Sequence, residues 1–124
     1  MGISTTNKCD LCSVSIETIS HLFWECPITR KFVFQVQNSL LNNVIVITRQ
    51  MFLFGSSDIT ARDYNFVFLY AKYFIFSAKN KASELNLSSF CKMLHQVKNT
   101  EEHMSVNSKN YLSFTAKWRL IHWF

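Results

Sequence analysis

Four side chains near the start of the sequence have the types and the spacing of a metal site. Three cysteines and a histidine lie within 18 residues, in the order Cys9, Cys12, His21 and Cys26. The pattern is C-x2-C-x8-H-x4-C, and Zn²⁺ prefers four tetrahedral ligands that are thiolates or imidazoles. Because the protein supplies all four ligands, no position is left for a catalytic water. The pattern therefore predicts one structural Zn²⁺ and no enzymatic activity.

Other interpretations of these residues stay open. A C-x2-C pair can form a redox couple, although no βαβ pattern surrounds Cys9 and Cys12. Free cysteines are often buried as plain hydrophobic residues, and that is what we expect of the isolated Cys91. The other histidines show no partner at ligand spacing and are expected to be structural or surface residues: His95, His103 and His122.

The spacing of the last two ligands restricts the local fold. His21 and Cys26 are five residues apart, so on one regular helix they would diverge by about 140°. Both reach one ion only if a short helix carrying His21 ends before Cys26. Pro27 then suits the first turn of the next helix, and Glu17 suits the positive end of the short one.

The same segment resembles a known family. The residues Cys9-x-x-Cys12 and Glu17-Thr18-x-x-His21-Leu22-Phe23-Trp24-x-Cys26-Pro27 are similar to the zinc-binding region that follows the reverse transcriptase of LINE-type (non-LTR) retrotransposons. The likeness extends from about Lys8 to Trp118 and includes the aromatic run 66–76, Phe90 and Lys117-Trp118. The chain departs from that pattern at Phe32-Val33-Phe34, where the family often has Phe-Trp, and it has no Tyr-x-Asp-Asp polymerase motif.

The resemblance implies a non-catalytic zinc-binding module that assists nucleic-acid binding, with RNA favoured over DNA. Phe23 and Trp24 could stack on bases and Arg30 and Lys31 could contact phosphates beside the metal. Alternatively, the aromatic pair covers the metal and the basic pair lies on a solvated helix face. Two further alternatives are a protein-docking module, with a reverse transcriptase core or another protein as partner, and a retrotransposon remnant without independent activity.

The elements that must position these residues are predicted to be helical. Apolar residues recur at helical spacing from Pro27 to about Leu41, and Asn42-Asn43 ends that helix. The run 44–47 is either a short strand or a buried connector, and 51–55 is expected to be a second apolar connector. Ser57 or Asp58 begins a helix to about residue 82. It is apolar nearly all round over 66–76, so we expect it to be the central helix, buried against the 27–41 helix.

The remaining chain and the composition agree with one helical domain. Asn86 or Ser88 caps a helix through Val97, polar residues follow at 98–103, and 104–116 is a weaker helix. Gly is present twice and Pro once among 124 residues, too few for a many-turned β fold. We predict a mainly α fold over 1–124, with a zinc motif at 8–27 and a helical remainder at 28–124. The net charge of +5 favours polyanions, and no membrane or export signal is visible, so an intracellular, non-membrane protein is expected.

Overall fold

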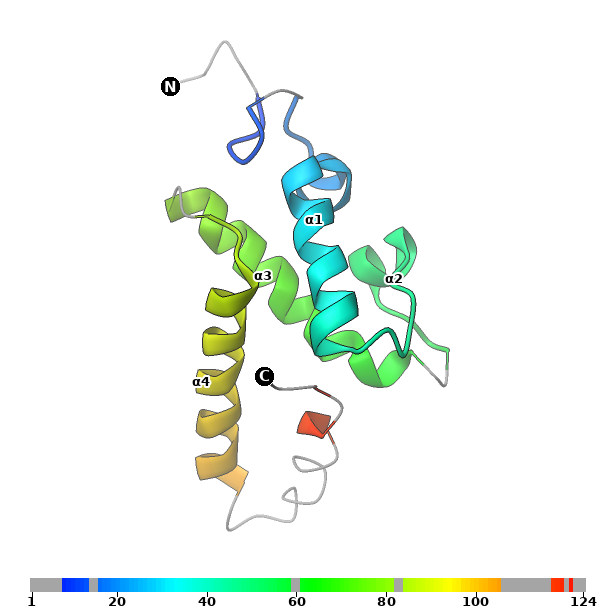
Figure 1. Ribbon diagram of the computed structural model, residues 1–124, viewed down its shortest axis with the longest axis vertical. Coiled ribbons are helices and arrows are strands. Elements are labelled where there is room, and N and C mark those ends of the chain that lie inside the picture. The colour runs from blue at the N-terminus through cyan, green and yellow to red at the C-terminus, as the bar shows by residue number, and fades with distance from the viewer. Residues whose placement is uncertain are drawn as a thin grey trace.

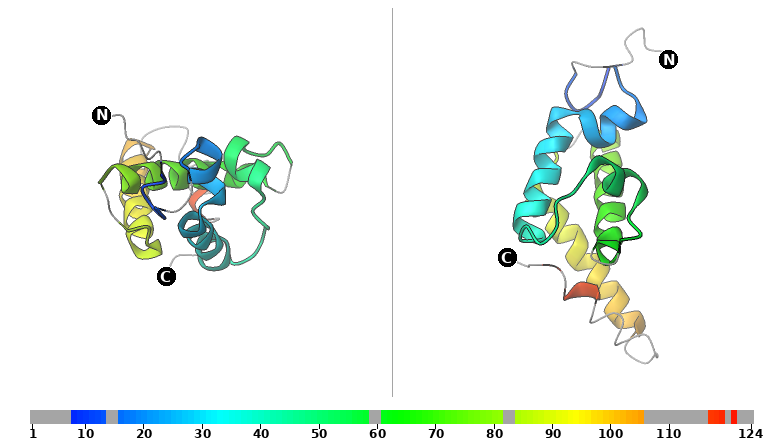
Figure 2. Two further views of the ribbon diagram at one scale, coloured as in Figure 1. Left: turned by 90° about the horizontal axis from the view of Figure 1, so that it is seen from above. Right: turned by 90° about the vertical axis from the view of Figure 1, so that its right-hand side faces the viewer.

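The computed structural model describes residues 8–13, 16–58, 61–81, 84–105, 117–119 and 121. Within them the chain is mainly helical, as predicted, and the single extended pairing is an isolated antiparallel bridge between Lys8 and Ile16. Figures 1 and 2 show helix α3 (Asn65–Lys81) passing behind α1 (Pro27–Gln35), while α4 (Leu87–Ser105) extends away from α3 toward the lower end of the view in Figure 1. The segment with the cysteine cluster lies at one end of the molecule, above the start of α1 (Figure 1).

The first long helix follows the sequence prediction closely. Pro27 occupies the first turn of α1, where its missing N–H has no helical partner to lose. The helix continues as a π-helical turn, η2 (Val36–Leu40). Asn42 and Asn43 then adopt left-handed φ angles of 51° and 57°, which asparagine tolerates better than most residues. The predicted helix over 27–41 and its end at the two asparagines are confirmed.

The next segment differs from expectation. Residues 44–47 form a connector in which Val44 and Val46 are exposed and Ile47 is buried. The expected second connector at 51–55 is instead a short helix, α2 (Arg49–Phe54). Thr48 caps it by accepting the Met51 N–H at 3.2 Å, and Phe52 packs into the core with its ring 6.2 Å from that of Phe68 on α3. Capping and packing on α3 make this apolar run helical.

Helix α3 starts later than predicted. The carbonyl of Asp58 accepts the N–H groups of Ala61 and Arg62 in a turn. A 3-10 turn, η3 (Arg62–Tyr64), follows before α3 begins. The run 66–76 does lie on one helix, as predicted, but it is not buried all round. Three large residues at positions i, i+4 and i+7 share an exposed face, with exposed fractions of 50–63%: Leu69, Tyr73 and Phe76.

The core forms where three helices meet. The ring of Phe32 on α1 lies 5.5 Å from that of Phe74 on α3 and 5.2 Å from that of Phe90 on α4. This confirms that α3 packs against the 27–41 helix. Cys91 is buried beside Phe90, as expected of a core residue.

The last described helix also extends further than expected. Asn86 caps α4 by accepting the Ser89 N–H at 3.0 Å, and the helix continues through the polar residues 98–103 to Ser105. His95 and His103 are exposed on it. Residues 106–116 of the expected final helix, and His122, lie outside the described residues.

Candidate metal centre

The first two cysteines lie on a tight turn, which we call the metal loop (residues 8–13). The Ser13 N–H donates to the Cys9 carbonyl at 2.8 Å, and Ser13 takes a left-handed φ of 59°. An antiparallel backbone bridge pairs Lys8, which precedes the two cysteines, with Ile16, which follows them. Cys9 is 1% exposed and Cys12 is half-buried. The turn thus holds both thiols on the inner side of the loop.

His21 begins a π-helical turn, η1 (His21–Glu25). Thr18 starts this turn: its hydroxyl oxygen accepts the His21 N–H at 3.0 Å and its carbonyl accepts the Leu22 N–H at 2.8 Å. The Cys26 N–H then donates to the His21 carbonyl at 2.7 Å, an i→i+5 bond. The helix ends before Cys26, which is extended at ψ 129°. The predicted end is present, and the wider π turn, which the sequence analysis did not foresee, brings residue 26 back toward residue 21.

The structure brings together all four residues that the spacing singles out. Their ligand atoms lie within 4.8 Å of one another. The Cys9 and Cys26 sulfurs are 3.9 Å apart, and the Cys12 sulfur is 3.4 Å from Nε2 of His21. A zinc tetrahedron with Zn–S near 2.3 Å and Zn–N near 2.0–2.1 Å has edges of about 3.8 Å between sulfurs and about 3.6 Å between sulfur and nitrogen. The two measured edges match those of a site that could hold a metal ion.

The chemical state of the thiols is consistent with this geometry. The 3.9 Å separation of the Cys9 and Cys26 sulfurs is far from a disulfide bond of about 2.05 Å, and the four cysteines are present as thiols and not as disulfides. Burial raises the pKa of the Cys9 thiol to about 11, and the neighbouring Cys26 adds to the increase. Without a cation this thiol keeps its proton at neutral pH, so a metal ion that binds there must displace it.

Two residues outside the ligand set support the centre, and neither role was foreseen. Thr29 on α1 is fully buried and donates its hydroxyl hydrogen to the Leu22 carbonyl of η1 at 2.6 Å. Glu17 accepts the Asp10 N–H of the metal loop at 3.3 Å and pairs with Lys79 of α3 at 2.8 Å. This pairing raises the pKa of Lys79, mainly through its hydrogen bond to Glu17. The sequence signals are a threonine two residues after Pro27 and a glutamate four residues before His21.

The four residues proposed for nucleic acid are not gathered into one patch. Phe23 and Trp24 are half-buried against the core, and the Trp24 ring lies 6.0 Å from that of Phe52. The Arg30 guanidinium stands over the Trp24 ring, 4.5 Å from its centroid. Lys31 is exposed and lines a different region, because successive residues of an α-helix are rotated by about 100°.

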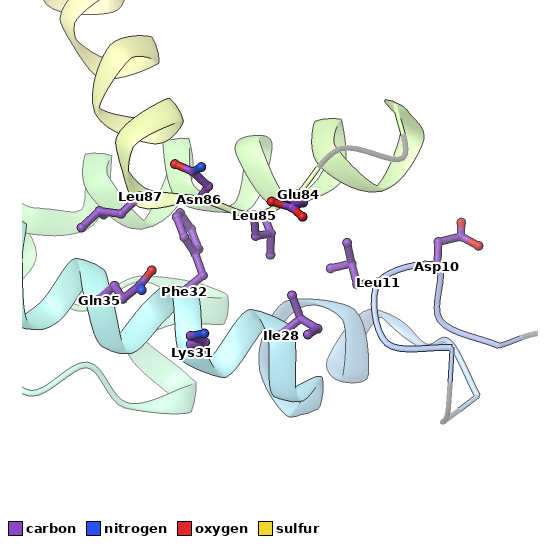
Figure 3. A pocket seen from close by; sticks show the side chains of 10 residues that line it. All are labelled: Asp10, Leu11, Ile28, Lys31, Phe32, Gln35, Glu84, Leu85, Asn86 and Leu87. Atoms are coloured by element: carbon purple, nitrogen blue, oxygen red, sulfur yellow. The ribbon is translucent and has the colours of Figure 1, made fainter.

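That region is a cleft of about 730 Å³ between the metal loop, α1 and the segment that leads into α4 (Figure 3). Half of its lining residues are leucine, isoleucine or phenylalanine, and these come from all three segments. Its charged lining residues are Asp10, Lys31 and Glu84. Lys31 therefore shares the cleft with two carboxylates, whereas Arg30 does not line it.

Comparison of the chain with protein-family models, with curated proteins and with solved structures finds no match in any of the three. Within the described part of the chain, no helix combines the length and the apolar character that crossing a bilayer requires. The interpretation of the centre therefore depends on its own geometry and chemistry.

Proposed function

We propose that the protein is a non-catalytic, zinc-stabilised helical module that assists the binding of single-stranded RNA, similar to the zinc-binding region that follows the reverse transcriptase of LINE-type retrotransposons. The observation that carries the proposal is that the ligand atoms of Cys9, Cys12, His21 and Cys26 lie within 4.8 Å of one another, with two separations that match the edges of a zinc tetrahedron. The resemblance of the motif and the net charge of +5 support the nucleic-acid part.

Zinc is the metal that best fits this donor set. Thiolate and imidazole ligands select Zn²⁺ over Mg²⁺ or Ca²⁺, which prefer oxygen. With four protein ligands the ion would have no open position, so it would order η1 and the metal loop and would not activate water. Native mass spectrometry tests this directly. We expect one zinc per chain; a metal-free folded protein would contradict the proposal.

Arg30 is the strongest candidate for a nucleic-acid contact. Its guanidinium is exposed and is held over Trp24, so it presents charge and a planar face together. A base or a phosphate could contact that face, since arginine both stacks and pairs with phosphate. Lys31 can add a second phosphate contact from the neighbouring side of α1, although Asp10 and Glu84 weaken the positive potential of the cleft that it lines.

Fluorescence anisotropy of a labelled single-stranded RNA across a salt series tests the assignment. Arg30→Ala should weaken binding and reduce the salt slope by about 0.7, which is the counterion release per single-strand contact. Lys31→Ala should have a smaller effect. Arg62→Ala is the matched control, because Arg62 is an exposed arginine on η3. If Arg30→Ala leaves affinity and slope unchanged, Arg30 is not the contact.

A protein-docking function is the second candidate. It is favoured by the exposed apolar face of α3, which carries Leu69, Tyr73 and Phe76. The same salt series separates the two functions. If the intact zinc-loaded protein shows no salt-dependent RNA binding, the docking function replaces the first proposal.

A further inference from the structure

A second cluster, remote from the metal centre in sequence, surrounds the ammonium group of Lys117. Its Nζ lies 4.8 Å from the ring centroid of Phe66, 5.1 Å from that of Trp118 and 6.0 Å from that of Tyr70. A cation within about 6 Å of an aromatic centroid is attracted by the electron-rich face of the ring. Three rings therefore surround one ammonium group, and we call them, with Glu101, the cation cage.

Glu101 pairs with the Lys117 ammonium group and also accepts hydrogen bonds from two of the aromatic residues. Its two carboxylate oxygens accept hydrogen bonds from Lys117 Nζ at 2.9 and 3.0 Å. One of these oxygens also accepts from the Trp118 indole N–H at 3.3 Å, and the other from the Tyr70 hydroxyl at 3.4 Å. The carboxylate thus holds two of the three aromatic walls in position around the ion.

The cage is assembled by the tertiary fold. Phe66 and Tyr70 are one turn apart on the same face of α3, Glu101 lies on α4, and Trp118 comes from the C-terminal segment. Trp118 is only 2% exposed, and its ring packs edge-on against Phe66 at 5.2 Å. The Lys117 side chain is 30% exposed, so the cage opens to solvent on one side. The Trp118 ring is thus held in place by packing, whereas solvent can reach the Lys117 side chain.

We propose that Phe66, Tyr70, Trp118 and Glu101 form a binding site for methylated ammonium groups, which Lys117 occupies within the same chain. Aromatic cages are the usual recognition device for methylated ammonium ions. Here the carboxylate adds a selective element, because it accepts N–H hydrogen bonds. A dimethylated lysine ammonium keeps one N–H for Glu101 and offers two methyl groups to the rings, and the free trimethylammonium ion carries the same single N–H. A quaternary ammonium keeps none, so the site favours the dimethyl form, as in dimethyllysine.

Lys117 sets the apparent affinity of the site for any outside ligand. A competing cation binds only the molecules in which Lys117 has left the cage. Its apparent dissociation constant is therefore the intrinsic dissociation constant divided by the fraction of such molecules. The site is therefore latent in the intact chain. This inference does not depend on the metal centre or on RNA binding.

The test removes the Lys117 side chain and keeps the four residues that form the cage. Lys117→Ala protein is titrated with trimethylammonium chloride, and the indole N–H signal of Trp118 is followed by NMR, with sodium chloride at equal ionic strength as the reference. We expect a saturable shift with a dissociation constant at least ten-fold lower than in the unmodified protein. Tetramethylammonium should bind several-fold more weakly. Lys92→Ala, which removes an exposed lysine of α4, should behave like the unmodified protein.

The variant Lys117→Ala with Glu101→Gln separates a site from general ion binding. It should bind trimethylammonium at least ten-fold more weakly than Lys117→Ala and lose the preference over tetramethylammonium. If Lys117→Ala does not fold, trimethylammonium should restore its helical circular dichroism in a saturable way, because a ligand that binds the folded state stabilises it. No saturable response or restoration, or an equal response after Glu101→Gln, would overturn the proposal.

Discussion

The hydroxyl of Thr29 donates a hydrogen bond to the carbonyl of Leu22 at 2.6 Å, and both residues are buried. This hydrogen bond joins η1, the π turn that carries His21, to helix α1. Leu22 follows His21 directly, so the bond fixes the π turn that presents the histidine. A side chain without any ligand function therefore helps to set the position of a ligand.

Replacing Thr29 by valine should show how much this bond contributes. Thr29→Val keeps the shape but leaves the Leu22 carbonyl buried without its partner, which costs about 1–3 kcal/mol. Urea unfolding of the zinc-loaded protein measures the loss. Thr100→Val is the control, because Thr100 makes the same kind of bond to the Gln96 carbonyl on an exposed part of α4. A loss no larger than that of Thr100→Val would show that the bond is not important for stability.

Removing one metal ligand should remove the metal. Cys26→Ser replaces a thiolate by a hydroxyl that binds Zn²⁺ poorly, so we expect zinc content to fall from about one per chain to near zero. Under the proposal that a bound ion orders the metal loop and η1, helical circular dichroism and thermal stability should fall as well. Cys91→Ser removes a cysteine that lies outside the cluster and should retain the zinc. Native mass spectrometry of the two variants side by side decides the outcome.

Two phenylalanines on α1 provide a matched pair for the core. Phe32 is 1% exposed and packs against Phe74 and Phe90, whereas Phe34 is 62% exposed. Phe32→Ala should destabilise the protein by about 3–5 kcal/mol, a large fraction of the roughly 5–15 kcal/mol by which native domains are stable. Phe34→Ala should change the free energy of unfolding by no more than about 0.5 kcal/mol. Equal effects in chemical denaturation would mean that α1 faces the core differently.

The pair between Glu17 and Lys79 should give a small, pH-dependent contribution. Glu17 raises the pKa of Lys79, so the folded chain holds this proton to higher pH than the unfolded chain does. The contribution is complete below the ordinary lysine pKa of about 10.4 and is lost as the pH rises through the folded-state value. A double-mutant cycle with Glu17→Gln and Lys79→Met should give about 0.5–1 kcal/mol at pH 7.

The same cycle should give less at pH 11.5. Lys81→Met, on the exposed side of the same helix, replaces Lys79→Met in the control cycle and should show no coupling to Glu17. Coupling between Glu17 and Lys79 that stays constant from pH 7 to pH 11.5 would contradict the assigned pKa shift.

Local signals in the sequence were sufficient for the main helices and for the cluster. Pro27 and the paired asparagines mark the ends of the first long helix through backbone sterics alone, and Asn86 marks the start of the last through its capping side chain. The four ligand residues were selected by type and spacing, which depend on the chemistry of the ion and not on the rest of the fold.

Features that depend on tertiary contacts were not predicted. Residues 51–54 became a helix because Phe52 packs against α3, and the exposed face of α3 arises because its neighbours cover only part of it. Arg30 and Lys31 are adjacent in sequence yet lie on different sides of α1. In the sequence Glu101 is one more polar residue beyond the predicted end of the helix at Val97, because its partners Tyr70, Lys117 and Trp118 come from distant parts of the chain.

The candidate ligands of the metal centre all lie within one short segment, from Cys9 to Cys26. Pro27 restricts Cys26 to an extended backbone. Closing such short loops costs little chain entropy. An ion can therefore be captured by the nascent chain before α3 and α4 have been synthesised. Once bound, the ion would fix Cys26, the residue that precedes α1, and would thereby define where the first helix starts.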